Sequence, residues 1–243
     1  MMQTFNKEDN IHKAWLFRIL EAIADDHTLA QIVYFKGGTC ASMLGLLDRF
    51  SVDLDFDYGG DKADIEKTRA ALEVIFQELG LIIKDQSKNG IQYFLKYENE
   101  GRSTIKLDFS FPIYQSSIYE PKYFAEIGKT LICQSTETMV AHKMCAVINR
   151  FEKTKHIAGR DIYDVHHFLM NNYGYNIPVI QERTGLEIKN FLEKLYQFIE
   201  KEVTEKIITE DLSSLVAPAK FKLLRKVLKR EVLSLIKNEL LKY

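Results

Sequence analysis

The sequence predicts an α+β fold, with a mixed sheet and flanking helices in the first half of the chain and an all-helical second half. Up to about residue 130, short segments of alternating apolar residues follow one another with helical segments between them; beyond that point helical spacing dominates. Only four prolines in 243 residues argue against an all-β chain rich in turns. We therefore expect two domains, residues 1–130 and 131–243.

The composition is that of an ordinary globular protein, with 46% apolar and 28% charged residues. Thirty-three basic residues against 34 acidic ones give a net charge of -1, which excludes a uniformly basic nucleic-acid coat protein but not a local basic patch. Three widely spaced cysteines form no disulfide framework and favour a reducing compartment. The N-terminus has no apolar signal core, and no run approaches the ~20 apolar residues that span a bilayer. We expect a cytoplasmic protein without membrane contact.

In the first half, helical spacing of apolar residues predicts a helix over 7–27. A β-branched and aromatic run predicts a buried strand at 31–35, and a Gly-Gly pair then opens an apolar helix that ends near residue 50. Strict alternation predicts a strand over 51–58, and helical spacing predicts a helix over 64–79. Three further strands are expected at 81–85, 91–98 and 103–111, with hairpin turns at Asn89-Gly90 and Glu100-Gly101.

In the second half, helical patterns cover residues 135–151, 160–172, 178–203 and 219–242. The sequence Ser-Thr-Glu-Thr that begins at Ser135 contains a helix cap.

The last of these helices is strongly basic. Residues 219–243 carry eight basic and two acidic side chains, a local charge of +6, and the remainder of the chain then carries -7. A basic amphipathic helix can bind RNA phosphates, lie on a membrane surface, or present a merely solvated outer face. The sequence leaves these three alternatives open.

Three aspartates carry the strongest chemical signal. Asp53 and Asp55 are two residues apart on a predicted strand, so they point the same way with backbones roughly 6–7 Å apart. Two carboxylates so placed call for a cation, and Mg²⁺ is commonly held by one or two carboxylates together with substrate phosphates. Asp108, on the polar face of a later strand, is a third candidate ligand. The alternative for each aspartate is an ordinary solvent-facing position on a strand.

A Gly-Gly pair at a helix start adds a phosphate site. Gly37 and Gly38 follow the strand at 31–35 directly, and with Thr39 they open the next helix, where backbone N–H groups favour phosphate. A glycine pair alone is usually only a turn. Together with Asp53, Asp55 and the distant Asp108, it is much more specific.

This combination resembles the polymerase-β-like nucleotidyltransferases and, more closely, the AbiEii-type nucleotidyltransferase toxins. The sequences Lys36-Gly-Gly-Thr39 and Arg49-Phe-Ser-Val-Asp-Leu-Asp55 reproduce the first motif of that family. Later family features are matched in order by Lys143 and by Arg160-Asp161-Ile-Tyr-Asp164. The resemblance covers about residues 31–170 and does not reach the C-terminal helices.

The resemblance implies a role for each matched residue. Asp53, Asp55 and Asp108 would bind Mg²⁺, and Asp108 would bind metal or deprotonate the attacking hydroxyl. Nucleotide binding would involve Gly37, Gly38, Thr39, Arg49, Ser51, Lys143, Arg160, Asp161 and Asp164. Lys143 would also balance phosphate charge during the reaction. An ordinary helix start, with acids in its first turn, is the alternative for residues 160–164.

The implied activity is Mg²⁺-dependent transfer of a nucleoside monophosphate from an NTP to an acceptor hydroxyl, releasing pyrophosphate. The resemblance implies the toxin of an abortive-infection or toxin–antitoxin pair, with a cognate antitoxin as partner. A tRNA or other RNA 3′ end is our first choice of acceptor. The alternatives are nucleotidylation of a protein hydroxyl, for example AMPylation, and a catalytically silent RNA- or partner-binding module. No Walker P-loop and no G-x-G-x-x-G motif is present.

Overall fold

A computed structural model describes residues 7–97 and 103–243, and their contacts divide the chain into two compact units. The first, called the sheet unit, comprises Met1–Leu44, Ser51–Ile113 and Tyr119–Gln134. The second, called the helical unit, comprises Gly45–Phe50, Tyr114–Ile118 and Ser135–Tyr243. The predicted hairpin turn at Glu100-Gly101 lies outside the described residues.

The sheet unit contains a seven-stranded mixed sheet in the order β3-β4-β5-β2-β1-β7-β6. This confirms the predicted α+β class with a mixed sheet and a helical C-terminal region. The strands are β1 (Val33–Lys36), β2 (Leu54–Tyr58), β3 (Ile82–Gln86), β4 (Gln92–Lys96), β5 (Thr104–Ser110), β6 (Tyr119–Phe124) and β7 (Lys129–Gln134). β2 pairs with β1 antiparallel and with β5 parallel. Alternating burial along β4 and β5 shows the predicted period of two.

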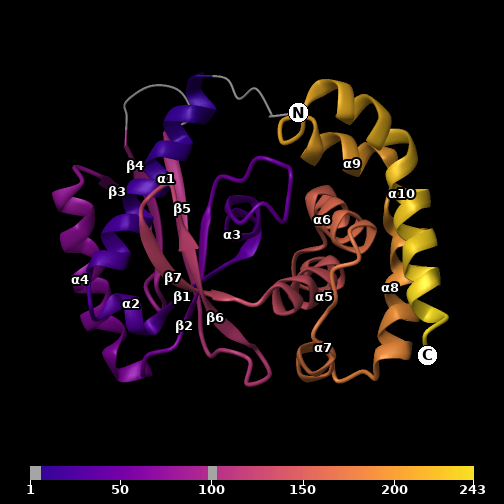
Figure 1. Cartoon of the computed structure of the whole chain (residues 1–243), viewed down its shortest axis with the longest axis horizontal. Coiled ribbons are helices and arrows are strands. Elements are labelled where there is room, and N and C mark those ends of the chain that lie inside the picture. Colours follow the sequence, from indigo (N-terminus) through magenta and orange to yellow (C-terminus); the bar gives the residue numbers. More distant parts are fainter. Residues whose placement is uncertain (1–6, 98–102) are drawn as a thin grey trace. The chain divides into compact units, whose positions relative to one another are not determined.

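In the part of the sheet unit that the structure describes, four α-helices and one short 3₁₀ turn accompany the strands. These are α1 (Lys7–Asp25), α2 (Leu29–Ile32), α3 (Gly37–Met43), η1 (Lys62–Asp64) and α4 (Ile65–Glu78). Figure 1 shows α1, α2 and α4 along one face of the sheet, with α3 on the other. The strand predicted at 31–35 starts later, at Val33, because α2 occupies the preceding four residues.

Two strands between residues 112 and 134 are not predicted by the sequence. β6 and β7 form an antiparallel hairpin, and β7 pairs with β1 in parallel. β6 is an edge strand that contains Pro121 and charged side chains, which obscure a clear alternation. Proline is tolerated at a sheet edge because the missing N–H costs no ladder bond there.

A buried carboxylate links four strands of the sheet unit, and its lysine partner adds a fifth. Asp57 on β2 accepts hydrogen bonds from Lys36 Nζ at 2.5 Å, Tyr119 Oη at 2.8 Å and Gln134 Nε2 at 2.6 Å. Lys36 also donates to Ser110 Oγ on β5 at 2.7 Å. Asp57 shares the parity of Asp53 and Asp55, but its oxygens are engaged by neighbouring strands. It therefore has a structural role.

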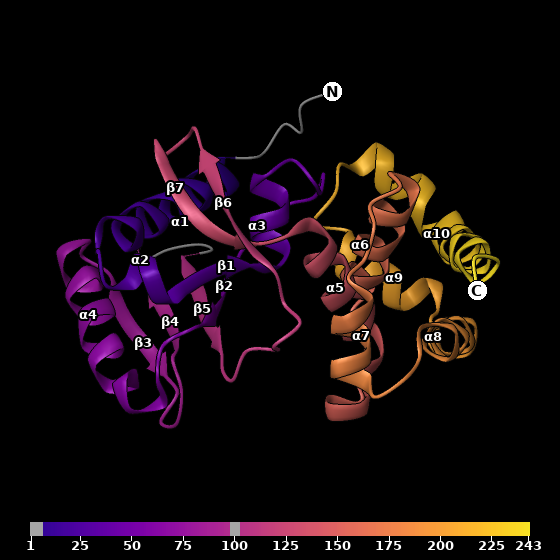
Figure 2. The same cartoon turned by 60° about the horizontal axis from the view of Figure 1, so that its bottom comes forward.

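The helical unit is built from α5 (Thr136–Thr154), α6 (Gly159–Met170), α7 (Ile177–Thr184), α8 (Ile188–Glu202), α9 (Glu205–Leu212) and α10 (Pro218–Leu240). α6 packs against α5, α9 and α10, and nine of its residues are buried. Figure 2 shows α10 alongside α8, and these two helices also contact each other. The predicted cap is confirmed, since Ser135 Oγ accepts the backbone N–H of Thr138 at 3.2 Å.

The prediction of one helix over 178–203 is wrong. The chain ends α7 at Gly185, whose φ of +69° is the left-handed conformation that glycine adopts most readily at a helix C-terminus, and α8 starts anew at Ile188. The short helix α9 is also missing from the prediction. Among residues 7–97 and 103–243, no helix is long and apolar enough to cross a membrane.

Replacing Asp57 with alanine tests the link between strands. Asp57→Ala leaves the Lys36 ammonium without its carboxylate, so we expect the sheet unit to lose about 3 kcal/mol of stability. Asp64→Ala, at an exposed helix start, should cost less than about 1 kcal/mol. Trp15 is the only tryptophan and lies on α1, so its fluorescence during urea unfolding follows this unit. Equal midpoints for the two variants would contradict the prediction.

Candidate functional site

The strand register places two of the predicted metal ligands side by side. Asp55 on β2 is directly opposite Asp108 on the parallel strand β5, and Asp55 also pairs with Lys36 on β1. Neighbouring strands lie about 4.8 Å apart, so the two carboxylates extend from adjacent points on one face. Both are partly exposed, and Lys106 Nζ contacts Asp108 Oδ2 at 2.5 Å.

Asp53 lies just before β2 rather than within it, which corrects the predicted strand of 51–58. The strand is shorter because β1 turns into α3 after Lys36, the partner of Asp55, and leaves no β1 residue opposite Asp53. Side chains replace the missing ladder. Thr39 Oγ1 donates to the backbone oxygen of Asp53 and lies 2.8 Å from Ser51 Oγ.

His12 also contacts the segment just before β2, through the residue next to Asp53. It is fully buried on α1, its Nε2 lies 2.8 Å from the carbonyl oxygen of Val52, and its Nδ1 lies 2.9 Å from Tyr97 Oη. A carbonyl can only accept, so Nε2 carries a proton in this arrangement. His12 and Thr39 together position the backbone that carries Asp53. No sequence pattern marks His12, which occupies one of many buried helix positions.

Gly37 approaches the carboxylate of Asp55 very closely. Its φ is +79°, and a Cβ added there would lie 2.7 Å from Asp55 Oδ2. Both observations require glycine at this position. Gly38 and Thr39 follow in the first turn of α3 and are buried. The first N–H groups of that helix have no intrahelical partner, as phosphate binding by Gly37, Gly38 and Thr39 would require.

The donor set fits a divalent cation that is also coordinated by substrate. Among the residues that the structure describes, no three His, Cys, Asp or Glu side chains are gathered closely enough to hold a metal by themselves. Asp55 and Asp108 nevertheless supply adjacent carboxylates, and Mg²⁺ commonly uses one or two carboxylates together with phosphate oxygens. The assignment of Asp53 as a third ligand stays a prediction.

The helical unit gathers the other predicted residues into a buried ionic cluster. Arg49 forms a bidentate pair with Asp164, with Nε–Oδ1 at 2.5 Å and Nη2–Oδ2 at 2.6 Å. Lys143 Nζ lies 3.0 Å from Asp161 Oδ1 and 2.9 Å from Asp164 Oδ2. Arg150 Nε contacts the second oxygen of Asp161 at 3.0 Å. We call these five residues the ionic cluster.

Burial and charge have opposite effects in this cluster. Burial alone would raise the pKa of Asp161, but the cations Lys143 and Arg150 outweigh it and hold that pKa well below its usual range. Burial would likewise lower the pKa of Lys143, yet Asp161 and Asp164 raise it. Lys143 and Asp161 therefore both stay charged in this buried cluster.

The contacts of Arg49 are to other protein groups, which suits a positioning residue better than one that touches the nucleotide. Arg49 is buried and also donates to the carbonyl oxygen of Phe50 at 3.0 Å, so its observed contacts orient Asp164 and the loop. Arg160 is half-buried at the start of α6 and adds to the charge that lowers the pKa of Asp161. Arg150 completes the cluster but belongs to none of the motifs read from the sequence.

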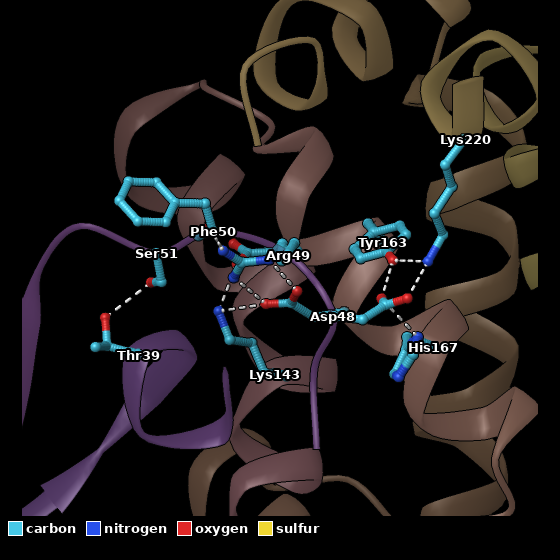
Figure 3. A network of polar contacts seen from close by, with 11 residues as sticks. Thr39, Asp48, Arg49, Phe50, Ser51, Lys143, Tyr163, His167 and Lys220 are labelled. Atoms are coloured by element: carbon cyan, nitrogen blue, oxygen red, sulfur yellow. Dashed lines mark hydrogen bonds and ion pairs between the residues drawn. The ribbon is translucent and has the colours of Figure 1, made fainter. Parts of the chain in front are cut away.

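Asp48 holds the loop beside Arg49 through a second set of contacts (Figure 3). It accepts hydrogen bonds from Tyr163 Oη and Lys220 Nζ, and His167 Nδ1 lies 3.2 Å away. These donors hold the pKa of Asp48 below its usual value, although burial opposes the shift. Asp48 thus connects Gly45–Phe50 to α6 and α10. Sequence reasoning missed it because its partners lie more than 100 residues away.

A mixed sheet with a Gly-Gly turn and carboxylates on adjacent strands is the arrangement expected of a nucleotidyltransferase. Residues 18–233 match the model of a family described as the nucleotidyl transferase AbiEii toxin of type IV toxin–antitoxin systems. This match covers most of the chain, and the protein belongs to that family. Membership of this family implies an NTP as substrate and an antitoxin as partner.

Solved structures agree on the fold. A proposed nucleotidyltransferase from H. pylori is 18% identical with a TM-score of 0.59, and the match covers 98% of each chain. JHP933 from Helicobacter pylori is 16% identical with a TM-score of 0.55, covering 97% of this chain and 96% of that one. No curated protein sequence matches the chain.

Gly37→Ala tests the close approach to Asp55. The new Cβ would displace the carboxylate and strain the backbone, so we expect nucleotide transfer to fall by about 100-fold or more, as for loss of a positioned electrostatic group. Gly80→Ala is the matched control, since Gly80 also has positive φ in the sheet unit but nothing within 4 Å of an added Cβ. It should cost about 1 kcal/mol of stability and leave turnover unchanged. A similar loss of turnover in both variants would contradict the role of Asp55.

Asp161→Asn tests the ionic cluster through pH. A carboxyl whose folded pKa is depressed stabilises the protein above its unfolded pKa of about 3.9 and loses that contribution as pH falls toward the folded value. We expect the wild-type helical unit to lose stability below about pH 4, and Asp161→Asn to reduce that dependence while losing about 3 kcal/mol at pH 7. Urea unfolding at pH 7 and below about pH 4, followed by far-UV circular dichroism, measures the free energy of unfolding of both proteins. The exposed Glu193→Gln is the control.

Proposed function

We propose that this protein transfers a nucleoside monophosphate from an NTP to the 3′ hydroxyl of an RNA, with tRNA as the first candidate acceptor. The observation that carries the proposal is the register of Asp55 and Asp108, with Gly37 against the Asp55 carboxylate. We further propose that the reaction uses Mg²⁺ and takes place in the cytoplasm as part of an abortive-infection response. Three free, buried cysteines are compatible with a reducing compartment.

In the proposed reaction the acceptor oxygen bonds to the α-phosphorus, and the bond from that phosphorus to the bridging oxygen of the β-phosphate breaks. Pyrophosphate leaves, and the hydroxyl proton passes to the carboxylate of Asp108. Mg²⁺, held by Asp53, Asp55 and Asp108, would neutralise phosphate charge. Gly37, Gly38 and Thr39 would hold the triphosphate through backbone N–H groups.

We propose that the ionic cluster supplies positive charge for a nucleotide phosphate. Its three cations exceed its two carboxylates by one charge. The ammonium of Lys143 has three donors, and the two aspartates occupy two of them. We propose that the remaining donor contacts a phosphate, and that Arg49, Asp161 and Asp164 keep Lys143 in place. Ser51 and Arg160 are proposed to support nucleotide binding.

The test is label transfer by the full chain. The protein is incubated with Mg²⁺, each α-labelled NTP in turn, and either deacylated total tRNA or a protein extract. We expect label on tRNA and its loss on chelation with EDTA. Label on protein alone would replace the RNA acceptor by a protein hydroxyl, and no transfer to either would favour a silent binding module.

Variants assign the activity to the paired carboxylates. Asp55→Asn and Asp108→Asn should each lower transfer by about 100-fold or more, because each removes a charge aligned on the reacting phosphates. Asp85→Asn, on an exposed position of β3 in the same sheet, should transfer label as wild type does. Normal Mg²⁺-dependent transfer by the Asp55 and Asp108 variants would remove them from the site.

A further inference from the structure

The C-terminal helix has one packed face and one open face. Leu224, Leu228, Val232 and Ile236 are buried, and α10 contacts α6, α8 and α9. The opposite face is exposed to solvent. Because the apolar face of α10 is used inside the helical unit, it is not available for insertion into a membrane surface.

The basic residues of α10 fall into two groups. Lys220 pairs with Asp48, Arg225 Nε lies 3.9 Å from Glu205, and Lys229 Nζ donates to the carbonyl oxygen of Glu200 at 2.8 Å. The second group consists of Lys222, Lys226, Arg230 and Lys237. All four are exposed, and among the described residues none of them has an ion-pair partner.

The second group forms a regular row, called here the basic stripe. Lys222, Lys226 and Arg230 are four residues apart and Lys237 follows seven residues later, so all four lie on one side of the helix. The row extends over about 22 Å at 1.5 Å per residue. The two acids of α10 are only partly exposed and are engaged elsewhere, Glu231 with His166 and Glu239 with Tyr175.

The basic stripe begins beside the ionic cluster. Lys220, two residues before Lys222, contacts Asp48, and Asp48 is the neighbour of Arg49 in the loop that carries the Arg49–Asp164 pair. The stripe runs from there toward the C-terminus. Positive charges at regular intervals that lead away from the ionic cluster, which is proposed above to contact phosphate, suit a polyanion with one end at that cluster.

We propose that the basic stripe binds the phosphate backbone of the RNA acceptor whose 3′ end enters the active site. The proposal rests on the RNA acceptor proposed above. It assigns phosphate binding to Lys222, Lys226, Arg230 and Lys237, and leaves Arg225 and Lys229 with a structural role. Phosphate contacts of this kind give affinity without base specificity, so the stripe binds tRNA and unstructured RNA alike.

The experiment measures RNA binding without NTP. Affinities of a fluorescein-labelled 24-nucleotide RNA and of deacylated total tRNA are determined by anisotropy between 50 and 300 mM KCl. The test variant carries Lys222→Gln, Lys226→Gln, Arg230→Gln and Lys237→Gln. The control carries Lys189→Gln, Lys194→Gln, Lys201→Gln and Lys206→Gln, which removes the same charge from exposed positions on α8 and α9. Circular dichroism melting verifies that both variants fold.

Each lost phosphate contact lowers the slope of log affinity against log salt by about 0.7–0.9, so the test variant should lose about 3 and bind at least about tenfold more weakly at 100 mM KCl. The double variant Lys222→Gln, Lys226→Gln should lose about half of that slope. The control should retain the wild-type slope. NTP affinity should be unchanged in all variants.

Two outcomes overturn the proposal. An unchanged slope in the test variant would leave the stripe as a solvated face or as a surface for an acidic protein. Equal losses in test and control variants would show a general charge effect. The label-transfer assay separates this result from the proposed function: transfer to RNA with an unchanged slope rejects only the stripe, whereas stripe-dependent binding without transfer rejects only the RNA acceptor chemistry.

Discussion

The position of Asp55 directly opposite Asp108 on adjacent strands is the constraint around which the candidate site of the sheet unit is arranged. Like charges in directly opposite positions destabilise a strand pair, so the surrounding structure must hold them. β2 is paired on both sides, and Lys106 contacts one of the carboxylates. The ion pair of Lys36 with Asp57 fixes the end of β1, from which Gly37 turns toward Asp55. A divalent cation bound by both carboxylates would relieve this repulsion.

The helical unit has the opposite balance of charge. Burial lowers the pKa of Lys143, but the charges of Asp161 and Asp164 outweigh burial and raise it, so Lys143 stays charged. A buried charge that is already desolvated and oriented needs little rearrangement when a phosphate arrives. Phosphoryl chemistry needs positioning and charge stabilisation more than covalent assistance from side chains.

Local patterns predicted the parts of the fold that local forces decide. Alternation located β2, β4 and β5 to within a few residues, and the Ser135 cap starts α5 as expected. The break at Gly185 was missed because helical spacing continues across it. Asp53 lies outside the strand predicted for it because β1 turns at Gly37 and offers it no partner, which is a non-local cause.

The candidate site was predictable only where a motif is continuous in sequence. Asp53, Asp55 and the glycine pair belong to such a motif, whereas Asp108 required the alternation of a distant strand. The pairing of Arg49 with Asp164 spans 115 residues, and no spacing rule anticipates it. His12 and Asp48 act through tertiary hydrogen bonds alone, so a single sequence carries no signal for them.

The interleaving of the two units along the chain has a consequence for how this protein can be divided. Gly45–Phe50 and Tyr114–Ile118 belong to the helical unit although both are flanked by segments of the sheet unit. Phe50 donates its N–H to the carbonyl oxygen of Leu215 at 2.8 Å, and Ser135 donates to that of Ile118 at 2.8 Å. A fragment that stops near residue 134 would keep these segments but lose the helices on which they pack. A premature stop in the second half of the gene would therefore disarm the toxin rather than release a working catalytic fragment, and a cell could escape such a toxin by a single nonsense mutation.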